Sequence, residues 1–417
     1  MKFTINTTEF KKVMQLVKTV AESSVATKVE AKAICLLRAF PKESKMRLDF
    51  SLKGSFLSYQ FDNVDISDVT EGTATGEFRR SVDLGVLAAL KFSGKTVSIS
   101  LGKNREGNTI AFSSGKMSGK LVVSHADIER EVEASRPADA SVELKYQFSS
   151  SMFQKALSGH NYGSHSDSDL AVKRVVRIYK DGTNLLFVSK DKHTAARIAK
   201  EYDIPSKEPI DFFILPKPLQ AILNAASSES PNFYFGANKE MWRLSCGKID
   251  VWFPNVLMQT AVDLEKLRGQ VDSLPSFSLK IPVATLDDVL VELAPFTAGD
   301  TLLAKEDMPI VHLTVTKDRT YFSINTSKAK DVCIDLDDVE FTNTMEEAPL
   351  DDLMLNFKYL EECTKSLTKN GSSDTITLRW WPFQNLESPT KGKTVTVNMG
   401  SDYYWITRIR PMEGKSV

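Results

Sequence analysis

The sequence predicts an α+β fold made of three tandem domains, and three observations support this prediction. An alternating, strand-like run that leads into an amphipathic helix occurs three times, beginning at Phe3, Tyr146 and Leu279. The copies begin about 140 residues apart, which is too long for a solenoid repeat and typical of a whole domain. Each copy carries a second helix signal, and 417 residues are enough for about three domains.

The first helix of each predicted domain has apolar side chains at helical spacing. They are Phe10, Val13 and Met14 in the first copy, Phe153, Ala156 and Leu157 in the second, and Leu286, Val289 and Leu290 in the third. The i, i+3, i+4 spacing places each set on one face of a helix, which can pack on a sheet.

The second helix of each domain follows a strand-like run. The positions that indicate it are Leu84, Leu87, Ala88 and Lys91, then Leu219, Ile222 and Leu223, then Leu360, Cys363 and Leu367. Pro216 and Pro218 stand near the start of the middle helix, where proline is tolerated.

Short alternating runs separated by Gly, Asn, Asp and Ser turns predict the strands. These runs are residues 46–52, 95–101, 184–189, 232–236, 311–316, 320–324, 375–381 and 393–399. Each domain therefore consists of two βαβββ-like units. The polar stretches 129–141 and 267–276 are the expected linkers, and we place the domains at 1–137, 138–273 and 274–417.

Composition is that of a soluble globular protein, with 42% hydrophobic and 26% charged residues. A net charge of −1 excludes a generally basic nucleic-acid coat but leaves room for a local basic surface. No stretch reaches the ~18 apolar residues that span a bilayer, and the N-terminal run lacks the apolar core of a signal peptide. Four scattered cysteines with no close pair suit a reducing cytoplasm and argue against a disulfide framework or a zinc knuckle.

No motif for catalysis, a cofactor or a metal emerges. SGKT at 93–96 resembles the end of a phosphate-binding loop, but Ala89 stands where its first glycine should be, and the segment enters a strand. His160 and His165 share a polar loop with Asp167 and Asp169, which we expect to be solvated.

Two acidic runs are expected to be solvent-facing charge: Asp335, Asp337, Asp338 and Glu340, and Glu346, Glu347, Asp351 and Asp352. With neither a GxSxG motif nor a Cys/His constellation, the sequence predicts a protein that is not an enzyme and needs no cofactor.

Basic residues recur on the helices that the repeat relates. The candidates for contact with DNA phosphates are Lys11, Lys12, Lys18, Arg79, Arg80, Lys91, Lys155, Lys217, Lys358 and Lys365. Lysines decorate the solvent face of many helices, so each alone is weak evidence. Their recurrence predicts a positive surface that attracts phosphate without reading sequence. The first helix of the third domain breaks this pattern with Asp287, Asp288 and Glu292.

Nearly the whole chain resembles the bacterial β sliding clamp, the processivity factor of replicative DNA polymerase. The resemblance is most specific in SKDKHTAARIA (189–199), DFFILPKPLQAIL (211–223), VWFPNVLM (251–258) and DYYWITRIRP (402–411). Their order and spacing, more than any single motif, carry it. The divergence of these segments is compatible with a member encoded by a bacterial virus, and the sequence leaves host or viral origin open.

The resemblance implies a head-to-tail homodimer in which helices line a ring around duplex DNA and antiparallel sheets lie outside. It also implies a DNA polymerase and a clamp loader as partners, no membrane, and a location in the cytoplasm of a bacterial cell or an infected bacterial host.

A partner pocket between the second and third domains is implied in the same way, for a short hydrophobic peptide. Its wall would be His193, Thr194, Ala195, Pro254, Met258, Trp405, Thr407 and Ile409. Here the chain departs from the family: Lys192 replaces a glycine, Thr194 and Ala195 replace Arg and Leu, and MEGKSV extends the C-terminus.

One alternative of another class stays open from sequence. Domain triplication can also build a β-rich structural or interaction protein, such as a virion or scaffold component.

Overall fold

The computed structural model describes residues 2–24, 34–52, 54–67, 78–83, 87, 90–104, 107–122, 132, 135–160, 176–190, 194–202, 210–226, 230–254, 275–297, 309–325, 329–344, 353–371, 373–381 and 394–407. The chain forms two compact units. The first contains Met1–Gln154 and Phe212–Leu257, and the second contains Lys155–Asp211 and Met258–Val417.

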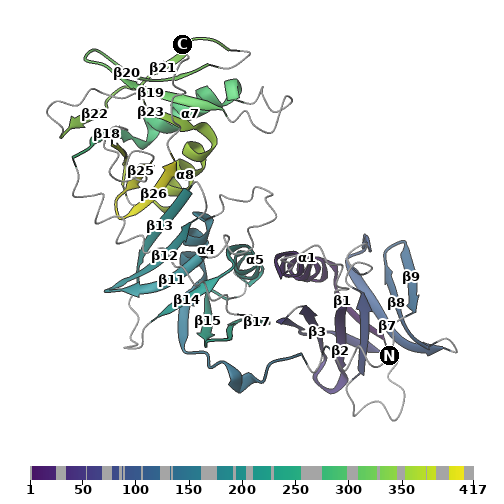
Figure 1. Cartoon of the computed structure of the whole chain (residues 1–417). Helices are drawn as coiled ribbons and strands as arrows, with labels where there is room; N and C mark the ends of the chain where they lie inside the picture. Colours follow the sequence, from purple (N-terminus) through teal and green to yellow (C-terminus); the bar gives the residue numbers. More distant parts are fainter. Residues whose placement is uncertain are drawn as a thin grey trace. The chain divides into compact units, whose positions relative to one another are not determined.

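An eight-stranded antiparallel sheet forms the larger layer of the first unit (Figure 1). Its strands, in spatial order, are β10 (Tyr146–Ser149), β15 (Asn232–Ala237), β16 (Met241–Cys246), β17 (Ile249–Pro254), β4 (Ser55–Phe61), β3 (Lys45–Leu52), β2 (Ile34–Phe40) and β6 (Phe78–Asp83). We call the β4–β17 pairing, in which Phe56 lies opposite Trp252, the first seam. It joins a strand of the first predicted domain to a strand of the second.

A five-stranded antiparallel sheet completes the first unit. Its order is β5 (Asp65–Ser67), β1 (Lys2–Asn6), β7 (Thr96–Asn104), β8 (Gly107–Ser114) and β9 (Met117–Val122). β9 forms one edge, because it pairs with β8 on one side and has no second partner among the described strands.

The second unit contains a nine-stranded and a four-stranded sheet. The first has the order β14 (Asp211–Ile214), β11 (Val176–Asp181), β12 (Asn184–Lys190), β13 (Thr194–Glu201), β26 (Asp402–Thr407), β25 (Thr394–Met399), β24 (Thr375–Trp380), β18 (Phe277–Pro282) and β22 (Glu340–Asn343). The other has the order β21 (Val332–Asp335), β20 (Thr320–Ile324), β19 (Ile310–Val315) and β23 (Leu353–Asn356). We call the β13–β26 pairing the second seam.

Each described helix of more than one turn follows a strand, directly or, for α5, after the single residue Leu215. They are α1 (Thr7–Ser24), α4 (Ser150–Ser158), α5 (Pro216–Ala226), α7 (Val283–Thr297) and α8 (Phe357–Asn370). The Asn6 side chain accepts hydrogen bonds from the backbone N–H groups of Thr8 and Glu9, at 2.8 and 3.2 Å. Asn356 does the same at the start of α8. These caps satisfy N–H groups that the helix leaves unpaired, and they fix where the strand turns into the helix.

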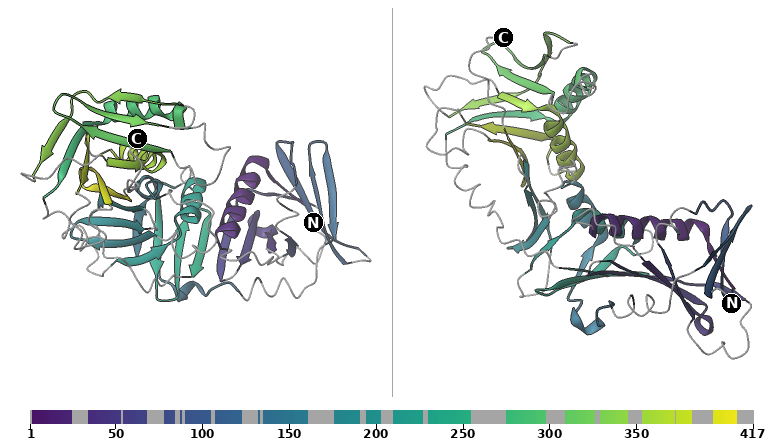
Figure 2. Two further views of the ribbon diagram at one scale, coloured as in Figure 1. Left: turned by 45° about the horizontal axis from the view of Figure 1, so that its top comes forward. Right: turned by 45° about the vertical axis from the view of Figure 1, so that its right-hand side comes forward.

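Helices cover one face of each large sheet. In the first unit α1 and α5 lie side by side, and α1 runs across the strands beneath it (Figure 2). In the second unit α7 contacts α8, and α8 packs on β25 and β26. The apolar positions that the repeat predicts on α1, α4 and α7 are all buried, as are those predicted on α5 and α8. The amphipathic prediction is therefore confirmed for these five helices.

The element order repeats strand, helix and three strands, as in β10–α4–β11–β12–β13 and β14–α5–β15–β16–β17. By this order, β4, β13 and β21 are equivalent, and so are β17, β26 and β9. At the first seam β4 pairs with β17, and at the second seam β13 pairs with β26. The remaining member of each set, β21 and β9, is an edge strand among the described strands. The α+β prediction is confirmed, whereas the three-domain boundaries stay a prediction. Among the described residues, no helix is long and apolar enough to cross a membrane.

Candidate functional site

The first helices of the three repeats present the same position with different charge. Lys12 of α1, Lys155 of α4 and Asp288 of α7 are each the sixth residue of their helix, and all three are exposed. Lys11 and Lys18 are exposed on α1 as well. Because the apolar face of each helix is turned to the core, these charged residues lie on the side away from the sheet.

The second helices show a parallel equivalence. Lys217 and Lys358 are the second residues of α5 and α8, and both are exposed. A cation in the first turn opposes the helix dipole, which favours negative charge there. The helix dipole therefore does not explain lysine at this position.

Positive charge is partly neutralised in the third repeat. Lys365 of α8 donates a hydrogen bond to Glu361, with 2.6 Å between Nζ and Oε1. Partial burial and the neighbouring Asp288 raise the pKa of Asp287 on α7, and Lys365 lowers it in turn. Lys365 thus has carboxylates of both α7 and α8 beside it.

Arg79 and Arg80 cannot face the same surface. They are consecutive in β6, where side chains alternate between the two faces of the sheet. Arg80 lies opposite Leu37, whose side chain is buried in the core, whereas Arg79 lies opposite Arg38. The backbone register therefore puts Arg80 on the helix-covered face and Arg79 on the other face, and contact of either residue with DNA stays a prediction. Lys91 is exposed just after the described Leu87 and Leu90.

The predicted partner pocket is only partly described. His193, Met258 and Ile409 lie outside the described residues, and Pro254 is exposed at the end of β17. Thr194 and Ala195 begin β13, opposite Ile406 and Trp405 of β26. Thr407 ends β26. The backbone therefore brings Ala195 and Trp405 together at the second seam, and the pocket as a whole remains a prediction.

His160 differs from the sequence prediction. It is 5% exposed instead of solvated, and its Nδ1 lies 2.5 Å from the Ser189 hydroxyl. Burial lowers the pKa of His160 from 6.5 to about 3, so the imidazole is neutral. His165, Asp167 and Asp169 lie outside the described residues. The sequence predicts that His160 belongs to a solvated loop, whereas it lies in the turn that directly follows α4 and is buried there.

The acidic runs behave as surface charge where they are described. Asp335, Asp337, Asp338 and Glu340 are exposed, and Asp335 pairs with Arg319 at 2.8 Å. The second run lies outside the described residues. Within the described part of the chain, no group of three or more His, Cys, Asp or Glu residues could hold a metal ion. SGKT leads into β7, a strand, as the sequence predicts.

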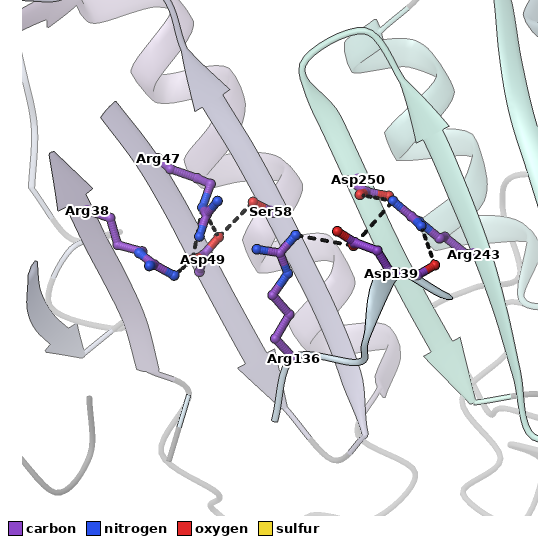
Figure 3. A network of polar contacts seen from close by, with 8 residues as sticks. All are labelled: Arg38, Arg47, Asp49, Ser58, Arg136, Asp139, Arg243 and Asp250. Atoms are coloured by element: carbon purple, nitrogen blue, oxygen red, sulfur yellow. Dashed lines mark hydrogen bonds and ion pairs between the residues drawn. The ribbon is translucent and has the colours of Figure 1, made fainter. Parts of the chain in front are cut away.

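A polar network on the other face of the eight-stranded sheet was not predicted (Figure 3). Asp49 of β3 is 2% exposed and contacts Arg38, Arg47 and Ser58. Beside it, Arg243 of β16 pairs with Asp250 of β17 at 2.7 Å and with Asp139 at 3.5 Å. Alternation in β2 and β3 could have indicated which face these side chains share, but not that they meet.

The solved structures most similar to this chain include bacterial DNA polymerase subunits. One is the β subunit of the DNA polymerase of Streptococcus pyogenes, with 14% identity, a TM-score of 0.69, and coverage of 99% of this chain and 100% of that chain. Another is the DNA polymerase III β subunit of Thermotoga maritima, with 14% identity, a TM-score of 0.69, and coverage of 98% and 99%.

The DNA polymerase sliding clamp of Bacillus subtilis matches with 12% identity, a TM-score of 0.69, and coverage of 99% of both chains. No protein-family model and no curated protein matches this sequence. At such low identity, likeness over the full length concerns the fold. This chain has the fold of the bacterial DNA polymerase III β subunits, as the resemblance in its sequence implied.

Proposed function

We propose that this chain is a DNA sliding clamp, a ring that encircles duplex DNA and tethers a replicative polymerase without itself being an enzyme. The observation that carries the proposal is the full-length likeness to β subunits of DNA polymerases, joined to exposed lysines at equivalent helix positions. Lys12 and Lys155 share one such position, and Lys217 and Lys358 share another. Contact with phosphates alone is blind to sequence, which permits movement along the duplex.

Cell context follows from this role. A clamp of this kind acts where bacterial DNA is replicated, in the cytoplasm of a bacterial cell or of an infected bacterial host. As the resemblance implies, a separate loader would consume ATP to open the ring.

We expect charge reversal at Lys11, Lys12 and Lys155 to weaken DNA binding by at least about 10-fold at low salt. Each lost lysine–phosphate contact means that one fewer counterion is released from the DNA on binding, and this release favours binding. The log–log salt slope should fall by about 0.9 for each lost contact. Fluorescence polarisation of a labelled duplex, titrated at several salt concentrations, measures both quantities.

The matched control reverses Lys42, Lys239 and Lys317, which are exposed in the short connections between strands and give the same change in net charge. If both triple variants lose affinity equally, net charge alone explains the effect, and the helix positions are not a DNA surface.

Ring closure is proposed to join β9 of one protomer to β21 of its partner. These edge strands are the equivalents of β17 and β4, which pair at the first seam, and of β26 and β13, which pair at the second. Phe296 supports this. It is the fourteenth residue of α7 and 38% exposed, whereas Val20, at the same position of α1, is fully buried. A head-to-tail interface closes only if the rotation per subunit divides a full turn, which six similar domains satisfy.

Cys333 of β21 allows a direct test, because it is the exposed cysteine of the four and the other three are buried. We expect Ser118→Cys or Lys120→Cys on β9 to form covalent dimers with a short bismaleimide. On nicked circular plasmid, the closed ring should survive denaturant and be released when the plasmid is linearised.

Lys42→Cys, away from β9, should give no covalent dimer. Failure of both β9 variants to cross-link, with the dimer present in solution, would contradict the proposed edge pairing.

The partner pocket at the second seam is proposed for a short hydrophobic peptide of a polymerase or loader. The backbone pairing of Ala195 with Trp405 supports it, since it brings two of the predicted wall residues together. Equal affinity of wild type and Trp405→Ala for a polymerase-derived peptide would argue against this assignment.

A further inference from the structure

The first seam contains an apolar cluster that is separate from the main core. Its members are Leu36, Phe56, Val132 and Trp252, with Met241 at its border. Leu36, Phe56 and Trp252 come from β2, β4 and β17, and the Phe56 and Trp252 rings meet edge to face at 5.6 Å. Val132 does not belong to the sheet. It comes from the stretch that joins the first two predicted domains, which we call the connector and which is described at Val132 and at 135–145.

The repeat makes this cluster the counterpart of the second seam. Trp252 is the fourth residue of β17, and Trp405 is the fourth residue of β26. In the two seams Trp252 lies opposite Phe56 and Trp405 lies opposite Ala195. Trp252 at the first seam thus occupies the position equivalent to that of Trp405 at the second seam, where the partner pocket is proposed.

The connector covers the apolar cluster of the first seam, and its side chains contact the cluster as those of a bound peptide would. Val132 is 4% exposed against the apolar cluster, and Trp252 is fully buried. The guanidinium of Arg136 lies 5.8 Å from the Trp252 ring centroid, and that of Arg243 lies 4.6 Å from it. An aliphatic anchor and a cation over an aromatic face are both common means of holding a peptide.

Charged contacts fix the next part of the connector. Arg243 donates to the Asp139 carbonyl at 2.9 Å, and its other nitrogen lies 3.5 Å from the Asp139 carboxylate. Asp250 holds the same guanidinium at 2.7 Å. Burial raises the pKa of Asp250, and its bond to Arg243 opposes that rise. The site therefore has an apolar centre and a charged rim, which is the usual anatomy of a peptide-binding surface.

We propose that the first seam is a second peptide-binding site whose resident ligand is the connector. Its ligand class is a short peptide with an aliphatic side chain and, four residues later, an arginine. Because the connector is covalently attached, its effective concentration is high, and a free peptide competes poorly in the wild-type protein. The inference does not depend on the DNA role.

The test uses the full chain and a labelled synthetic peptide with the sequence of residues 130–140. Val132→Asp removes the resident anchor and leaves the sheet side of the site intact. We expect this variant to bind the peptide saturably and at least ~10-fold more tightly than wild type, with the added change Trp252→Ala abolishing the binding. Ala138→Asp puts the same charge at an exposed connector position and should behave as wild type.

Arg136→Ala provides a second route if Val132→Asp fails to fold, because it loosens the connector without placing a charge in the site. It should bind the peptide with an affinity between those of wild type and Val132→Asp. If neither variant binds the peptide better than wild type while its strands keep wild-type hydrogen exchange, the connector is not a displaceable ligand and the proposal is overturned.

Discussion

Replacement of Asp49 by alanine is expected to destabilise the first unit by about 3–5 kcal/mol, because breaking a buried ion pair leaves the partner charge without compensation. Asp49 is 2% exposed, and Arg38 and Arg47 are 13% and 20% exposed. Arg38 and Arg47 lie directly opposite each other in the β2–β3 register. Without the carboxylate, two guanidinium groups would face one another on neighbouring strands, where like charges are destabilising. The Ser58 hydroxyl would also lose its 2.7 Å acceptor.

Hydrogen exchange of β2, β3 and β4 is the suitable measurement, because a chain with two compact units need not unfold in one step. Asp335→Ala is the matched control. It removes the partner of Arg319, but in a pair whose side chains are 49% and 58% exposed. Such a surface pair contributes at most about 1 kcal/mol. Similar losses for the two variants would show that burial of Asp49 does not matter.

Acidification from pH 7 to pH 5 is expected to lower the free energy of unfolding of the second unit by about 2 kcal/mol through His160 alone. Burial lowers the folded-state pKa of His160 from 6.5 to about 3. His160 therefore binds a proton near pH 6.5 in the unfolded chain but stays unprotonated at that pH in the folded chain. The stabilising contribution is complete above pH 6.5 and is lost progressively as the pH falls from there toward 3.

His160→Gln removes this titration while keeping a polar group near Ser189, and it should flatten the loss of stability between pH 7 and 5. Exchange protection of β12, which carries Ser189, reports the effect locally. An unchanged pH profile in His160→Gln would mean that the imidazole titrates normally in the folded protein.

Helix periodicity was enough to predict the five longer helices, because burying an amphipathic face is a local property of each segment. Phe10 and Val13 on α1 and their counterparts on α4 and α7 are buried as expected. The strands were predictable for the same reason, since a run such as 184–189 alternates within itself. Pairing across a seam was not predictable, because it joins β4 to β17 over a distance in sequence that no local pattern spans.

The predicted basic residues show both what local patterns predict and what they do not. Periodicity places Lys12 and Lys155 away from the core, and the structure exposes both. Alternation within β6 puts Arg79 and Arg80 on opposite faces, and only the register of β6 against β2 decides which of them shares the helix-covered face. Lys365 carries a full charge in the sequence, but its neighbour Glu361 lies 2.6 Å away in the helix.

The sequence by itself determined that this chain repeats a strand–helix unit, which positions of each helix are buried, and which family its segments resemble. Those properties depend on neighbours in the chain. Only the tertiary structure decided that β9 and β21 are among the edge strands of the described sheets, that His160 is buried and neutral, and that the connector lies on Trp252. These properties depend on contacts between distant segments, where packing and desolvation act on side chains that sequence spacing does not relate.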